Sequence, residues 1–288
     1  MTEARRPGPA VVKLGGELLE EPAVLGRVAR RLAHLAEAGP LVVVHGGGRE
    51  VSADLARRGI PVRAVDGLRI TDGPTLDVVV GVLAGQVNTR LVAALAGAGA
   101  SAGGLTAAAG RMTSVRRASR YRAADGTRVD LGFVGQPVGE PRPRLVLDLC
   151  RTGHLPVVAS IGASAAGQLF NVNADTLAGH LAAGLGASRL VIAGGTAGVL
   201  DADGRTIPAV DEAAIDDLIG RGRASAGMVA KLIACRTARR GGVREVVIVD
   251  GRRRAFDASP GTTVGGPIAG RAPELRRRSR KSGEDAAS

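Results

Sequence analysis

The sequence predicts an α/β protein in which helices cover both faces of a largely parallel sheet. Apolar runs typical of buried strands alternate with segments whose apolar residues recur every three or four positions. Hydrophobic residues make up 45% of the 288 residues and aromatic residues only 1%, so Ala, Val, Leu and Ile must form the core, as in buried parallel sheets. Several strands run into glycine-rich turns. Because the carboxyl ends of parallel strands share one edge, we expect a ligand site there.

The composition also limits the class of protein. Charges and prolines occupy the first ten residues, where a secretory signal would have an apolar stretch. The apolar residues 76–100 include Asp77, Gln86, Asn88 and Arg90, so we do not expect a membrane span. Cys150 and Cys235 form no metal-binding or redox motif, and we expect both to be buried in a reduced compartment. These features predict a soluble, cytoplasmic protein.

The net charge is +12 and the sequence pI is about 11.2, values that also occur in nucleic-acid-binding proteins. The aromatic residues that would stack on bases are nearly missing. Part of the charge lies in residues 266–288, whose composition predicts a basic disordered tail. We therefore do not expect nucleic acid to be the partner.

The first two predicted strands each end in glycines. Residues 10–14 form a strand with Lys13 near its end, followed by Gly15 and Gly16. Residues 41–45 form a second strand that ends at His45 and is followed by three glycines. Glycines let a ligand approach the backbone and offer N–H groups to an anion. A buried lysine needs a partner, so Lys13 is a candidate for the site, whereas His45 is expected to be a structural hydrogen-bonding group.

The region after the second strand is more ambiguous. Arg69 lies in a polar loop, where it could bind a carboxylate or simply be a surface arginine. We expect Thr75 to cap a helix that extends to Leu95. Residues 111–135 are rich in arginine and turns, which predicts hairpins that could form a lid or carry solvated charge.

Residues 156–185 hold the densest set of polar candidates. A strand at 156–161 leads through a loop to Asn171, Asn173 and Asp175, and a helix face formed by every fourth residue follows. Asn173 or Asp175 could merely cap that helix, or these side chains could belong to a ligand site. The local sequence leaves both readings open.

The pattern repeats in the second half of the chain. A strand at 189–192 leads to a turn with four polar or glycine candidates: Gly194, Gly195, Thr196 and Gly198. A helix is predicted at 211–219, and Ser225 begins another that runs to Arg240, with Lys231 expected in its first turn. Lys13, Lys231 and Asp175 could reach one space. Two cations that neutralise spreading charge are what phosphoryl transfer needs.

The order and spacing of seven short motifs then become informative. They are VVKLGG at 11–16, VVVHGGG at 42–48, GLRITD at 67–72, LAGQVNTRLV at 83–92, LPVVASIG at 155–162, GQLFNVNAD at 167–175 and GMVAKL at 227–232. With these motifs, residues 10–265 resemble the amino acid kinase family, and within it the branch that phosphorylates N-acetyl-L-glutamate. The resemblance implies an open αβα sandwich with the acyl amino acid bound by about residues 10–160 and ATP by about residues 161–265.

The resemblance also implies residue roles. Lys13 and Lys231 would stabilise the transferring phosphoryl group, and Asp175 would orient both lysines without acting as a base. The substrate-binding residues would be Gly47, Gly48, Arg69 and Asn171. The residues near ATP would be Gly15, Gly16, Gly194, Gly195, Thr196, Gly198, Arg223, Ser225 and Gly227. Mg²⁺ would be held through the phosphates, so we expect no dedicated metal ligands.

The chain departs from the family pattern in two places. Ala193-Gly194 replaces a Ser/Thr-Asp pair at the nucleotide turn, and residues 106–110 lack the acid of a Gly-x-Asp-Gly segment. Only ten residues precede Val11, and arginine-inhibited hexameric relatives carry a longer N-terminal helix there. We therefore expect an arginine-insensitive homodimer with the helix at 75–95 as its surface.

Two other functions remain open. One is a kinase of the same family that acts on an aminoadipate or glutamate linked to a carrier. The other is a catalytically idle regulatory or nucleic-acid-binding relative, which the two missing acids would favour.

Overall fold

The computed structural model describes residues 8–123 and 125–265, and its core is an eight-stranded sheet. The strands lie in the order β14, β16, β15, β13, β1, β2, β10, β5. All neighbours are parallel except β15 and β16, so the prediction of a mostly parallel sheet is confirmed with one antiparallel pair. Their bounds, in that order, are Ala209–Val210, Thr262–Val264, Glu245–Asp250, Ala187–Gly194, Gly8–Leu14, Leu41–His45, Leu155–Ala159 and Ala102–Thr106.

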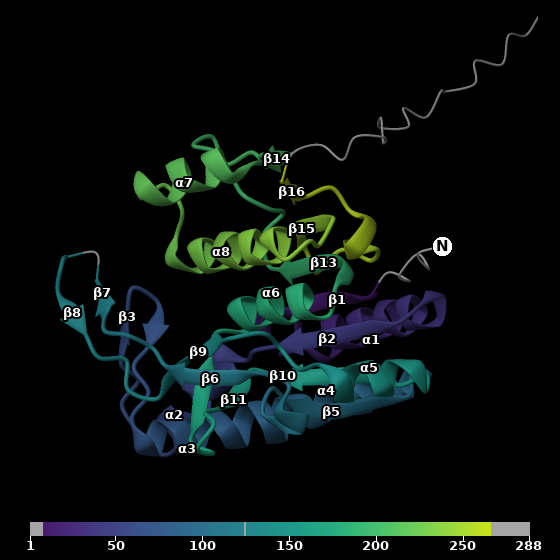
Figure 1. The fold of residues 1–288 in the computed structure, drawn as a ribbon, viewed down its shortest axis with the longest axis horizontal. Helices are drawn as coiled ribbons and strands as arrows, with labels where there is room; N and C mark the ends of the chain where they lie inside the picture. The colour runs from purple at the N-terminus through teal and green to yellow at the C-terminus, as the bar shows by residue number, and fades with distance from the viewer. Residues whose placement is uncertain (1–7, 124, 266–288) are drawn as a thin grey trace, which may run out of the picture.

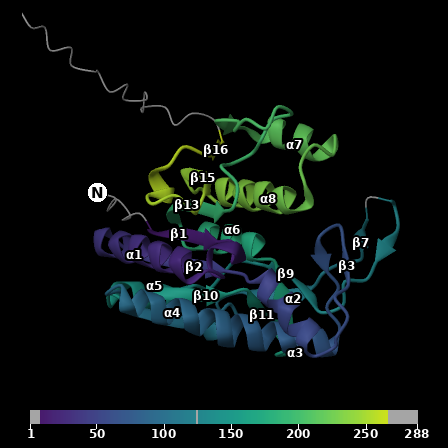
Figure 2. The ribbon, with the colours of Figure 1, turned by 180° about the vertical axis from the view of Figure 1, so that it is seen from behind.

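Helices cover both faces of this sheet, as Figures 1 and 2 show from opposite sides. Successive strand residues point to opposite faces, so Val12 and Leu14 of β1 belong to one buried cluster and Val11 to another. The first cluster includes side chains of α1 (Pro22–Ala38), α2 (Gly48–Arg57), α3 (Gly73–Val80) and α4 (Asn88–Gly97). The second includes side chains of α5 (Arg144–Arg151), α6 (Ala174–Gly184), α7 (Glu212–Gly220) and α8 (Ala226–Arg240).

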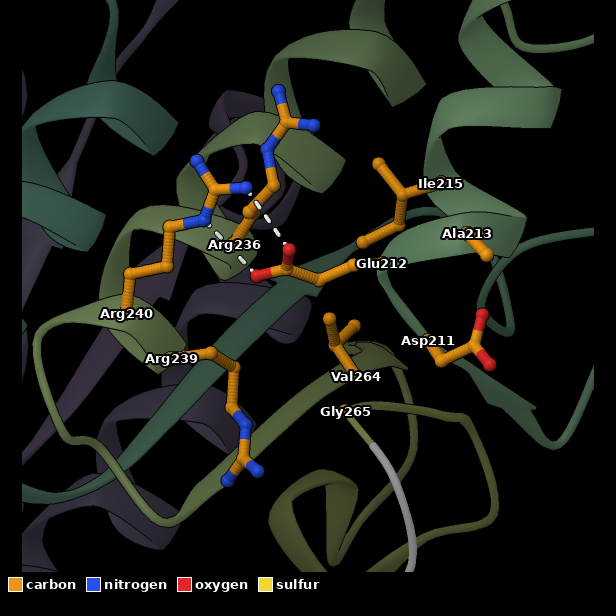
Figure 3. A pocket seen from close by; sticks show the side chains of 9 residues that line it. All are labelled: Asp211, Glu212, Ala213, Ile215, Arg236, Arg239, Arg240, Val264 and Gly265. Atoms are coloured by element: carbon orange, nitrogen blue, oxygen red, sulfur yellow. Dashed lines mark hydrogen bonds and ion pairs between the residues drawn. The ribbon is translucent and has the colours of Figure 1, made fainter.

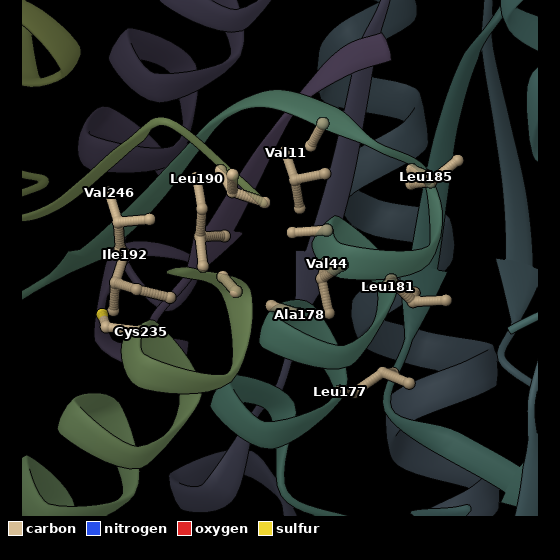
Figure 4. Close-up of a cluster of buried hydrophobic side chains, with 14 of the residues drawn as sticks. Val11, Val44, Leu177, Ala178, Leu181, Leu185, Leu190, Ile192, Cys235 and Val246 are labelled. Atoms are coloured by element: carbon tan, nitrogen blue, oxygen red, sulfur yellow. The ribbon is translucent and has the colours of Figure 1, made fainter. Parts of the chain in front are cut away.

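The second cluster is built from small and branched side chains. In Figure 4, Leu177, Ala178 and Leu181 of α6 lie beneath the strands, and Cys235 of α8 lies beside Ile192. Cys235 is fully buried as predicted, whereas Cys150 is only partly buried, which corrects the expectation for that residue. Cys150 is near the end of the short helix α5, where its side chain lies next to the carbonyl of Leu41.

The helix predicted at 75–95 is longer and begins earlier. It extends over α3, a π-helical segment η2 (Gly81–Val87) and α4. The cap is Asp72, not Thr75, because Asp72 Oδ1 accepts a hydrogen bond from Thr75 N at 3.0 Å. By length and composition this helix could cross a membrane, with a mean hydropathy of 1.6 over its most apolar window. A single such helix is weak evidence, and 44% of that window is buried inside the protein.

A small four-stranded barrel stands beside the large sheet. It consists of β6 (Ser114–Arg117), β9 (Val134–Val138), β11 (Ile161–Ala163) and β12 (Leu169–Val172). The strand predicted at 156–161 is therefore divided at Ser160, because the chain leaves the large sheet after β10 and enters the barrel at β11. A hairpin is present in the predicted segment 111–135, formed by β7 (Tyr121–Arg122) with β8 (Arg128–Val129). A second hairpin, formed by β3 (Ala64–Val65) with β4 (Leu68–Arg69), was not predicted, because Arg69 was expected to lie in a loop.

Three short 3₁₀ helices complete the described elements: η1 (Gly16–Leu18), η3 (Ala109–Arg111) and η4 (Phe256–Ala258). The predicted basic tail at 266–288 lies outside the described residues, as do residues 1–7.

Candidate active site

The register of the central strands brings the glycine-rich turns together. Leu14, the last residue of β1, is level with Ala193 of β13 on one side and with His45 of β2 on the other. Ala159 of β10 is level with His45 in turn. The N–H of Gly15 donates to the carbonyl of Ala193 at 2.8 Å. The turns that follow these strands are therefore neighbours at one edge of the sheet, as predicted.

Two lysines meet one buried carboxylate at this edge. Lys13 Nζ lies 2.9 Å from Asp175 Oδ1, and Lys231 Nζ lies 3.4 Å from Asp175 Oδ2. The side chains of Lys13 and Asp175 are each 7% exposed, and that of Lys231 is 18% exposed. Residues far apart in the sequence thus form one cation–anion–cation group, as the sequence suggested.

The local structure explains how Asp175 is free for this role. Asn173 is the helix cap, with its Oδ1 accepting from Thr176 N at 3.0 Å, so Asp175 stands in the first turn of α6 without capping it. Burial by itself would raise the pKa of the Asp175 carboxyl, but the charges of Lys13 and Lys231 lower it below its usual value. Asp175 is therefore an anion that holds two ammonium groups. Lys231 stands in the second turn of α8, not in the first as predicted, because α8 begins at Ala226.

A cavity of about 280 Å³ opens beside Lys13 and Asp175. Backbone of both glycine turns lines it, and a Cβ on Gly16 would come within 3.1 Å of Gly47 Cα. Such close packing of two backbone segments favours glycine at this position. The predicted residues that line the cavity are Lys13, Gly15, Gly16, Gly47, Gly48, Arg69, Asn171 and Asp175.

Arg69 enters the cavity with part of its guanidinium unpaired. Its Nη2 donates to Gly48 O at 2.9 Å and to Ser52 Oγ at 2.7 Å. Its Nη1 is buried and has no hydrogen-bond partner among the described residues. Burial lowers the pKa of Arg69, but a guanidinium stays charged in proteins. A buried, charged donor atom without a described partner favours an anionic ligand, so the structure supports the carboxylate-binding interpretation of Arg69 over that of a surface arginine.

Asn171 faces the cavity from β12. Its Nδ2 donates to Thr71 Oγ1 at 3.2 Å, which orients the amide. Ser160, which is 2% exposed, also lines the cavity and was not singled out from the sequence. A lone serine between two apolar strands gives no sequence signal, and the division of the strand at this residue appears only in the fold.

His45 supports the floor of the site instead of reacting in it. Its Nδ1–H donates to Gly46 O at 3.0 Å, and its Nε2 accepts from Asn88 Nδ2 at 2.9 Å. Burial lowers the pKa of His45 from 6.5 to about 4, so the ring is neutral. The structural role expected from the sequence is confirmed.

The residues predicted for the nucleotide are arranged more openly. Gly194 ends β13 beside Lys231 and Gly195 follows it, but neither lines the cavity. Gly198 has φ +132°, and a Cβ there would lie 2.5 Å from Thr262 Oγ1, so packing already requires this glycine. Arg223 is paired with Asp217. Thr196, Ser225 and Gly227 also lie outside the cavity, so the nucleotide-binding roles of this group stay predictions.

Comparison with known proteins identifies the family. The sequence matches the model of the amino acid kinase family over residues 9–250, most of the chain. The chain belongs to the amino acid kinase family.

Relatives of this amino acid kinase cover nearly its whole length. It is 41% identical over 247 residues to acetylglutamate kinase of Acidiphilium cryptum, with 84% of this chain and 82% of that protein covered. It is 42% identical to acetylglutamate kinase of Sorangium cellulosum, with 91% and 93% covered. A solved Streptococcus mutans protein superposes with a TM-score of 0.74 at 26% identity, covering 89% of this chain and 98% of that one.

Two further charged residues of this kinase belong to the site and were missed in the sequence. Glu17 of η1 lines the cavity, and Arg252 lies beside Gly195, where a Cβ would be 3.2 Å from its Nη2. Neither residue lies in a pattern that separates it from the many surface charges of the chain. Only the meeting of β1, β13 and β15 at one edge brings them to the nucleotide turn.

A second cavity, of about 440 Å³, lies between α7, α8 and the end of β16. Figure 3 shows that two of its charged side chains pair with each other, because Glu212 accepts two hydrogen bonds from Arg240 at 2.9 and 3.0 Å. None of the residues predicted for the active site lines it.

Proposed function

We propose that this protein transfers the γ-phosphoryl group of ATP to the γ-carboxylate of N-acetyl-L-glutamate, the phosphorylation step of arginine biosynthesis. The observation that carries the proposal is the buried pair of lysines held by Asp175 beside two glycine turns. Acetylglutamate kinases that cover four fifths or more of the chain support the choice of substrate.

The substrate half of the reaction uses the cavity. The unpaired Nη1 of Arg69 would receive the α-carboxylate of the acyl amino acid, because a planar guanidinium matches a carboxylate. Asn171 would hydrogen-bond the acetamido group. Backbone N–H groups of Gly47 and Gly48 would hold the reacting carboxylate near Lys13.

In the transfer itself, a γ-carboxylate oxygen forms a bond to the γ-phosphorus while the bond from that phosphorus to the bridging oxygen breaks, and ADP leaves. The ammonium groups of Lys13 and Lys231 offset the charge that spreads over the phosphoryl oxygens. Asp175 keeps both ammonium groups aimed at that space. No base is required, because the attacking carboxylate carries no proton.

The nucleotide half would lie along Gly194 and Gly195, with Gly15 and Gly16 donating N–H groups to its phosphates. Thr196 and Gly198 would extend this turn, and Arg223, Ser225 and Gly227 would border it. Mg²⁺, held through the phosphates, would neutralise part of their charge. Of the described residues that line the cavity, the acids are Asp175 and Glu17, and Asp175 is already engaged by two lysines.

We extend the proposal to organisation and compartment. Residues 10–160 would bind chiefly the acyl amino acid and residues 161–265 the nucleotide. The exposed small residues of the helix from Gly73 to Gly97, including Gly81, Gly85 and Ala93, would pack against a second copy in a homodimer. The free thiols of Cys150 and Cys235 suit the reducing cytoplasm.

The test is to incubate the protein with N-acetyl-L-glutamate, MgATP and hydroxylamine and to measure the hydroxamate that traps an acyl phosphate. We expect product from the wild type and none above background from Lys13→Ala. A folded wild type that makes no hydroxamate would overturn the substrate assignment. Sedimentation of the same preparation tests the homodimer, which a monomeric mass would contradict.

A further inference from the structure

Glu17 is an acid with no partner among the described residues, in a site that would bind phosphates under the proposed function. It is the middle residue of η1, and the side chains of Leu18 and Leu19, which follow it, are buried in the core. Glu17 is partly buried, lines the cavity and makes no hydrogen bond or ion pair within the described part of the chain. A carboxylate here would repel a polyphosphate unless nearby cations offset it.

The position of this carboxylate is defined by the glycines around it. A Cβ on Gly194 would lie 3.3 Å from Glu17 Oε1 and 3.6 Å from Lys231 Cε. A Cβ on Gly195 would lie 3.4 Å from the same oxygen and 3.2 Å from Arg252 Nη2. The Glu17 carboxylate therefore fills the space that a side chain at position 194 would take, next to Lys231 and Arg252. Gly15 permits this, since a Cβ there would lie 2.5 Å from both carboxylate oxygens.

The two lysines are not held equally by Asp175. The distance to Lys231 is 3.4 Å against 2.9 Å for Lys13, and Lys231 is also the more exposed. One carboxylate does not fix both ammonium groups with the same precision. A second anion on the nucleotide side of Lys231 would help to fix the position of its ammonium group.

We propose that Glu17 is a positioning residue for Lys231. Gly194 at the end of β13 has no side chain and carries no charge. Glu17 of η1 places a negative charge in the same space. Through its charge, without a direct ion pair, Glu17 draws the ammonium group of Lys231 toward the phosphates and, with Arg252, keeps the local charge balanced before ATP binds. This inference rests on the proposed function only in that Lys231 contacts the transferred phosphoryl group.

The experiment compares three variants. Glu17→Gln keeps the shape and removes the charge. The double variant Glu17→Ala/Gly194→Asp moves the acid to the other side of the same space, which is feasible because φ at Gly194 is not in the left-handed region. Glu21→Gln, an exposed acid four residues further along, is the matched control.

We expect kcat/KM for ATP to fall about tenfold in Glu17→Gln, since the negative charge near Lys231 is lost, with KM for N-acetyl-L-glutamate unchanged. The double variant should regain most of this loss, and the control should equal the wild type. Affinity for the non-hydrolysable analogue AMP-PNP with Mg²⁺ is the second readout and should change in the same order. This affinity measurement tests the role of Glu17 even if the wild type makes no hydroxamate.

Three results would overturn the proposal: full activity and AMP-PNP affinity in Glu17→Gln, no recovery in a folded double variant, or recovery of Glu17→Gln by excess Mg²⁺ alone. The last would make Glu17 a ligand of the metal and not a positioning residue.

Discussion

The two halves of the site are built in different ways. The half that we assign to the acyl amino acid is a cavity lined by buried and partly buried polar groups, with Arg69, Asn171 and Ser160 placed by β4, β12 and the end of β10. The half assigned to the nucleotide is a more open turn, in which backbone groups of glycines would make most of the contacts. Its arginine, Arg223, is exposed and already paired. If the proposed assignment is right, we expect acceptor specificity to depend on side chains and nucleotide binding to depend mainly on backbone groups and Lys231.

Asp175 joins the two halves, so its replacement should have the largest effect. In Asp175→Asn, both ammonium groups lose the anion that holds them, and we expect kcat to fall about 1,000-fold. The hydroxamate assay measures this loss. Asp148→Asn, which changes a half-exposed acid of α5, is the control and should retain full activity. Activity within tenfold of the wild type in Asp175→Asn would mean that the lysines position themselves.

The buried construction of the acceptor half should also make folding sensitive to acid. The pKa of His45 is about 4 in the folded protein and 6.5 when exposed, so the unfolded chain binds more protons between these values. The contribution of His45 to the free energy of unfolding is therefore fully present at neutral pH. It falls by about 3 kcal/mol as the pH drops from 6.5 to 4.

Chemical denaturation across this pH range measures the effect of His45. The decline should be smaller in His45→Gln, and it should be unchanged in His34→Gln, which alters an exposed histidine. Equal pH slopes for the wild type and His45→Gln would contradict the assignment of the decline to this ring.

Arg69→Lys should affect binding of the acyl amino acid but not of ATP. A lysine cannot form the paired donors that match a carboxylate, so we expect KM for N-acetyl-L-glutamate to rise about 30-fold. KM for ATP should stay the same, because Arg69 lies in the acceptor half. Steady-state kinetics with each substrate varied provides the measurement, with the exposed Arg27→Lys as control. A parallel change in KM for ATP would show that the halves are not independent.

The smallest effect should come from Arg223→Ala. Its guanidinium is exposed and bound to Asp217, and solvent screens such a charge, so KM for ATP should change no more than about threefold. A much larger change, with the protein folded, would show that this arginine turns toward the nucleotide and that the second half also depends on side chains.

Much of this kinase was predictable from local patterns. Apolar runs and glycines predicted the strands, the parallel sheet and the edge where the site lies, because burial on both faces demands nearly continuous Val, Leu, Ile and Ala. Lys13 and Asp175 could be selected because charged residues next to buried strands need a partner. The same signals did not reveal that Asp72 is the cap of the long helix or that β10 and β11 are separate strands. The choice of cap and the division of the strand depend on which nearby groups compete for the same backbone hydrogen bonds.

The sequence by itself determined most strands and helices of the large sheet, the edge at which the glycine turns gather and the residue types available for phosphoryl transfer. Only the tertiary structure decided which charges meet. It pairs Lys13 and Lys231 with one carboxylate, leaves Nη1 of Arg69 unpaired, and brings Glu17 and Arg252 to the turn at Gly194 and Gly195. The reason is physical: burial and local propensity act over a few residues, whereas electrostatic contacts depend on distances that the packing of β1, β13, α6 and α8 fixes across the whole chain.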